Sequence, residues 1–96
     1  MNRFFDDLGE RLSRAAAQRG MAIDPPALDP AVARELLDLA RVAAHTQERR
    51  FAPLASFVTG IAVERMRQAG GPADPEAVAE LIREITSGLE SEPASL

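Results

Sequence analysis

Apolar residues recur at three- and four-residue steps along four separate segments of this 96-residue chain, and this spacing constrains the fold more than any other feature. Such steps place apolar side chains on one face of a helix, whereas a strand shows period-two alternation, which no segment of the sequence has. Alanine, a strong helix former, is common throughout the chain. The sequence therefore predicts an all-α fold, a small four-helix bundle with short loops.

The first helix is predicted over residues 3–19, with Asn2 as its N-terminal cap. Gly20 follows and ends it, because glycine readily adopts the left-handed conformation that closes many helices. Residues 21–28 contain two consecutive prolines, and each proline moves the residue before it away from the helical region. This segment is therefore predicted to be a linker.

The other three helices are predicted to begin at prolines. Asp-Pro pairs at residues 29–30 and 74–75 combine a capping acceptor with a proline at the first helical position, where its missing N–H costs nothing. The second helix is expected to reach about His45. Pro53 is predicted to open the third helix, which ends at the glycines at positions 70–71.

The chain is too short for two filled cores, so we expect one helical domain over residues 1–89. Residues 90–96 are predicted to be a frayed, disordered tail. The inner stripes of the four helices give the predicted core, which consists of Leu8, Leu12, Leu36, Leu39, Phe57, Ile61, Leu81 and Ile85.

Composition argues against several functional classes. All eleven basic residues are arginine, and fifteen acidic residues leave a net charge of −4, a poor footprint for nucleic acid. With no cysteine and a single histidine, the chain offers no ligand set for a structural metal. No glycine-rich phosphate loop or serine nucleophile elbow is present. We therefore predict no catalytic residues, no cofactor and no enzymatic activity.

The hydropathy pattern also bears on location. No apolar run approaches the roughly 20 residues that a membrane crossing needs. The first residues include two aspartates where a signal peptide would have its apolar stretch. We therefore expect a cytoplasmic protein that does not enter a membrane.

Polar residues concentrate around the predicted end of the second helix. If that helix continues for one turn past His45, then Glu48 and Arg49 join its face, because residues three and four positions apart are neighbours on a helix. Arg41 lies on the same face. A mixed-charge cluster is then expected at this end.

The start of the third helix raises a related question. If Pro53 is its first residue, the cap position falls on Ala52, which has no side-chain acceptor for the free N–H groups that follow. Either Glu48 reaches back to them, or an anion is held there together with Arg49 or Arg50. The simplest interpretation of these polar residues is that they interact with the carbonyl groups and the dipole at the end of the second helix and serve no binding function. The candidate site for a partner or an anion consists of Arg41, His45, Glu48, Arg49, Arg50 and Pro53.

A set of short motifs in the middle of the chain carries a resemblance. It consists of the run LLDLARVAAH at 36–45, then Glu48-Arg49, Ala52-Pro53-Leu54, Phe57-Val58 and Gly60. In these motifs the chain resembles a small actinobacterial domain of unknown function that is associated with molybdenum cofactor biosynthesis and is fused in some members to molybdenum cofactor guanylyltransferase. It departs from that pattern at Arg50, where the family has proline, and between His45 and Glu48.

The resemblance implies a pathway and a partner, and it carries over no catalytic residue. We therefore expect a non-catalytic accessory domain that binds the guanylyltransferase or a molybdoenzyme through the candidate site and the acidic fourth helix. The alternative is a module that binds a small anionic ligand, such as a nucleotide or a pterin pyrophosphate. A homodimer is a third possibility, because so short a bundle can bury part of its apolar stripes in a second copy.

Overall fold

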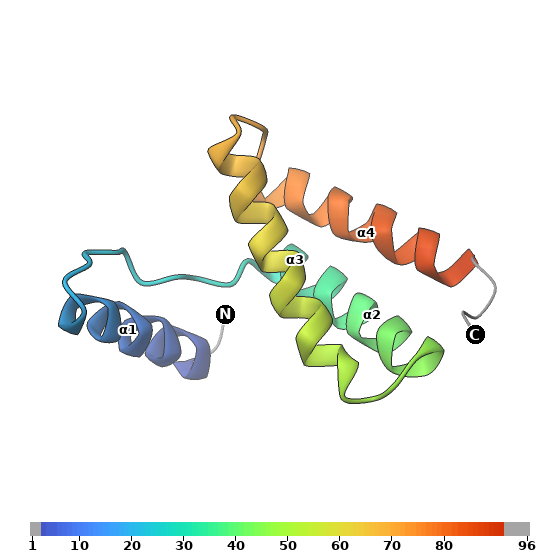
Figure 1. Ribbon diagram of the computed structural model, residues 1–96, viewed down its shortest axis with the longest axis horizontal. Coiled ribbons are helices and arrows are strands. Elements are labelled where there is room, and N and C mark those ends of the chain that lie inside the picture. Colours follow the sequence, from blue (N-terminus) through green and yellow to red (C-terminus); the bar gives the residue numbers. More distant parts are fainter. Residues whose placement is uncertain (1–2, 92–96) are drawn as a thin grey trace. The chain divides into compact units, whose positions relative to one another are not determined.

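The computed structural model describes residues 3–91, and within them it contains four helices and no strand (Figure 1). The prediction of an all-α fold with four helices is confirmed. The chain divides into two compact units, residues 1–30 and 31–96. The predicted cap at Asn2 lies outside the described residues. The helices are α1 (Arg3–Gln18), α2 (Pro30–Thr46), α3 (Phe51–Gln68) and α4 (Pro75–Ser91).

Two helices end at glycines with positive φ, as the sequence predicts. After α1, Gly20 has φ 79°, and the amide that follows it donates to the carbonyl oxygen of Ala16 at 2.9 Å. After α3, Gly70 has φ 88°, and the next amide donates to the carbonyl oxygen of Met66 at 3.0 Å. Both ends are Schellman motifs, which need a residue without a Cβ at the left-handed position.

The first unit consists of α1 and the extended segment over residues 21–28. The Ser13 hydroxyl donates to the carbonyl oxygen of Ile23 at 2.8 Å, which holds this segment along the helix. Gly9 is buried at the point where the segment passes over α1, and a Cβ there would collide with the carbonyl oxygen of Pro26. The predicted linker is therefore anchored to α1 by one side-chain hydrogen bond and one close backbone contact.

The core of the second unit lies on α2 and α4. Val42 and Ile82 are its largest fully buried side chains. Thr86 is buried as well, and its hydroxyl donates to the carbonyl oxygen of Ile82 at 2.8 Å, so it adds no unsatisfied polar group. The other buried residues are small or aliphatic: Ala33, Leu39, Ala43 and Ala79.

Two ion pairs show that α2 and α4 run parallel. Glu35 of α2 accepts from Arg83 of α4 at 3.0 Å, and further along both helices Arg41 donates to Glu90 at 3.1 Å. Because residue numbers increase in the same direction on both helices, the two axes point the same way, as Figure 1 shows. Parallel neighbours need a long connection, and α3 supplies it.

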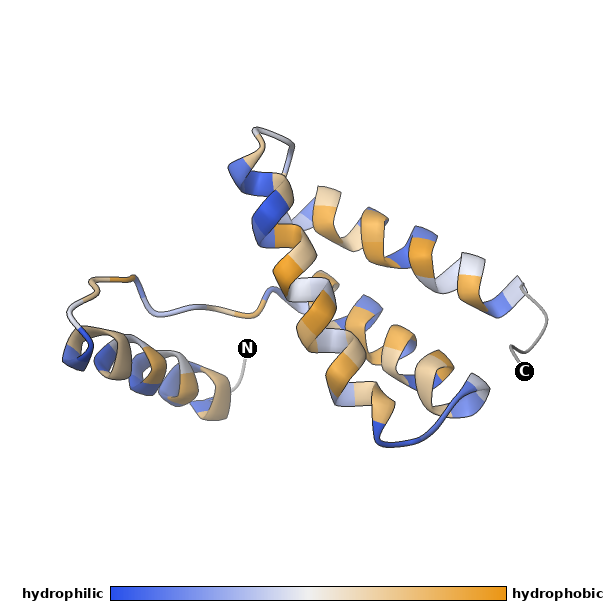
Figure 2. Cartoon of the chain, viewed as in Figure 1, coloured by the Kyte–Doolittle hydropathy of each residue, from blue (hydrophilic) through white to orange (hydrophobic). Residues whose placement is uncertain are grey.

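α3 carries its bulky apolar residues on the outside. No residue of α3 is fully buried, and its half-buried residues are mostly small ones. Phe57 is 71% exposed and Val58 is 63% exposed. Figure 2 shows the apolar residues along α3. The half-buried residues are Ala52, Ala55, Ser56, Thr59 and Val63, which lie on one face at helical spacing.

The predicted core is accordingly right in part. Leu39 is buried, and Leu36 and Leu81 are half-buried. The sequence correctly grouped residues that share a helix face, but the face covered on α3 is the one with small side chains. Small side chains let backbones approach closely, so bulk alone did not identify the contact. The residues wrongly assigned to the core are Leu8, Leu12, Phe57, Ile61 and Ile85, all exposed.

Two predicted boundaries are also corrected. α3 begins at Phe51, two residues before Pro53, because proline is tolerated anywhere in the first turn. α4 continues through Glu90 and Ser91, and the ion pair with Arg41 fixes its last turn. The rest of the predicted tail, residues 92–96, lies outside the described residues. Both helices predicted at Asp-Pro pairs begin at the proline.

Candidate functional site

The candidate site falls on the connection between α2 and α3. α2 ends at Thr46, and the amide of Gln47 still donates to the carbonyl oxygen of Ala43 at 3.1 Å. Glu48 and Arg49 follow in a turn, so the helix does not continue for the extra turn that would place them on its face. Every residue from 45 to 51 is exposed. We call residues 45–53 the connection surface.

Arg41 takes part in a different set of contacts. Its guanidinium donates to Asp38 on the same helix at 2.8 Å and to Glu90 of α4 at 3.1 Å. The hydrogen bond to Asp38, followed by the one to Glu90, raises the pKa of Arg41 above its usual value. Arg41 thus joins α2 to α4, and the structure does not bring it into a cluster with Glu48 and Arg49.

The charged groups of the connection surface are weakly held. Arg50 and Glu48 approach to 3.4 Å, and both side chains are exposed, so this pair contributes little to stability. Within residues 3–91, the side chains of His45 and Arg49 make no hydrogen bond or ion pair. The guanidinium of Arg49, exposed to water and without a protein partner among these residues, is available to a binding partner.

The start of α3 satisfies its own amides. The amide of Phe51 donates to the carbonyl oxygen of Glu48 at 3.0 Å. The amide of Ala52 donates to the carbonyl oxygen of Arg49 at 3.2 Å. The third helical residue, Pro53, has no amide hydrogen. The preceding turn therefore takes the place of both the Glu48 side chain and the bound anion that the sequence suggested.

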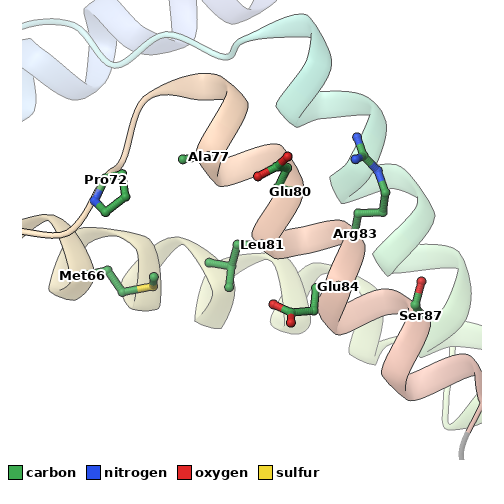
Figure 3. Close-up of a pocket in the computed structure, with 8 residues that line it drawn as sticks. All are labelled: Met66, Pro72, Ala77, Glu80, Leu81, Arg83, Glu84 and Ser87. Atoms are coloured by element: carbon green, nitrogen blue, oxygen red, sulfur yellow. The ribbon is translucent and has the colours of Figure 1, made fainter.

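A second surface feature lies between the end of α3 and α4 (Figure 3). It is an open hollow of about 620 Å³, with Met66 from α3 and Leu81 from α4 among its apolar residues. Glu80 and Glu84 are exposed residues on successive turns of α4, which agrees with a solvated acidic face. Arg83 lies with its guanidinium on Glu35 of α2. The hollow brings together no catalytic pair.

The sequence matches the model of one known family. A family described as a domain of unknown function, DUF6457, matches residues 1–95. The chain belongs to this family. No curated protein and no solved structure matches the chain.

The described residues also bear on metal binding and membrane insertion. Across residues 3–91, no three histidine, cysteine, aspartate or glutamate side chains come together as metal ligands would. None of the helices in that part of the chain combines the length and the hydropathy of a membrane-spanning segment.

The sequence reasoning missed one feature beside the connection surface. Leu54, Phe57, Val58 and Ile61 form a continuous exposed apolar stripe on α3, which we call the α3 stripe. The three- and four-residue spacing was visible in the sequence, but it was assigned to the core. The signal that could have found it is the second stripe of small residues on the opposite face of the same helix.

Proposed function

We propose that this chain is a cytoplasmic, non-catalytic accessory domain of molybdenum cofactor biosynthesis, at the stage of molybdopterin guanine dinucleotide. Its partner is molybdenum cofactor guanylyltransferase or a molybdoenzyme. The pathway and the partner rest on the resemblance carried by residues 36–60. The surface rests on one observation: exposed cationic side chains without strong partners stand beside an exposed aromatic ring in the connection surface.

Side chains of this kind suit a protein interface. Arginine and aromatic residues are enriched in the binding regions of proteins and supply a large share of binding energy. Arg49 and Arg50 directly precede Phe51 in the sequence, and all three are exposed. An acidic partner surface with a shallow apolar pocket would complement them.

The alternative, binding of a small anion, keeps fewer donors. The first two amides of α3 already donate to carbonyl oxygens, so Arg49 and Arg50 would have to hold the anion by themselves. We therefore favour the protein partner and use the anion as a separate arm of the test.

The test is a calorimetric titration of the guanylyltransferase with the full chain and its Arg49→Ala variant. We expect the Kd to rise at least about tenfold in the variant, as for an interface hot spot, while stability stays within about 0.5 kcal/mol. His45→Ala should weaken binding in the same direction. The matched control is Arg34→Ala, because Arg34 is an exposed arginine of α2 away from the connection surface.

Unchanged affinity in Arg49→Ala would contradict the proposed surface, and absence of binding would contradict the proposed partner. The anion arm uses inorganic phosphate or pyrophosphate. Shifts of the amide resonances of residues 54–56 at millimolar ligand, weakened by added salt, would support the small-ligand alternative instead.

A further inference from the structure

We draw no further inference here: the strongest candidate, the α3 stripe with the surface groove beside it at Gly60, carries none, because nothing in the structure shows what covers this apolar face.

Discussion

α2 and α3 are nearly equal in length, at 17 and 18 residues, but they use their apolar residues in opposite ways. α2 buries four residues, including Leu39 and Val42. α3 buries none and keeps Phe57 and Val58 in water. The difference shows that an apolar stripe on a helix does not by itself tell which face of that helix the rest of the unit covers.

The contacts between helices explain why α2 is the better buried of the two. α2 and α4 lie parallel and share the aliphatic core, and ion pairs tie both ends of this contact. The half-buried residues of α3 are mostly alanine, serine and threonine, which fill little volume.

The largest difference is expected between two isoleucines. Ile82 is 1% exposed and Ile61 is 38% exposed. Ile82→Ala removes buried methyl groups from the core and should destabilise the chain by about 2–5 kcal/mol, while Ile61→Ala should cost well under that at a concentration where the chain is monomeric. Urea denaturation of the two variants measures both values. Equal losses would mean that α3 is buried as deeply as α4.

Gly9→Ala tests the anchoring of the extended segment in the first unit. The added Cβ would collide with the backbone oxygen of Pro26, so the segment must move away from α1. We expect a loss of about 1–3 kcal/mol, typical of overpacking, and faster amide exchange over residues 21–28. Hydrogen exchange followed by NMR is the measurement. Unchanged exchange would show that the segment does not lie against Gly9.

Gly60→Ala and Gly88→Ala separate helix propensity from packing. Neither added Cβ meets an atom within 4 Å, so each variant should gain about 0.5–1 kcal/mol when the chain is monomeric. Thermal unfolding of the two variants measures both gains. A loss at Gly60 that Gly88 does not share would show that another backbone approaches Gly60.

The smallest effect concerns a carboxyl of α3 that is paired within its own helix. The hydrogen bond from Arg67, at 2.9 Å, lowers the pKa of Glu64 below its usual value. Its small contribution to stability is present above the unfolded pKa and is lost as pH falls through the folded pKa. An NMR titration should show the pKa of Glu64 rising toward its usual value in Arg67→Ala. No change in that variant would contradict the pairing.

The candidate site could be located from the sequence, although its internal geometry could not. Polar residues between two predicted helices identify a connection, and the structure places residues 45–51 there in exposed positions. The extra helical turn and the free amides at Pro53 were both wrong. Each error came from the turn at 48–50, whose backbone carbonyl oxygens accept from the first amides of α3. Such backbone hydrogen bonds leave no signature in side-chain chemistry.

The sequence by itself determined the number of helices, the starts of α2 and α4 at Asp-Pro pairs, and the ends of α1 and α3 at Gly20 and Gly70. These features depend on hydrogen bonds and dihedral preferences within a few residues, which local sequence encodes. Tertiary structure alone decided the parallel pairing of α2 with α4 and the outward position of Phe57. The helical period of a sequence predicts which residues share a face of the helix. Burial of that face depends on which other segment packs against it, and that segment is distant in the sequence.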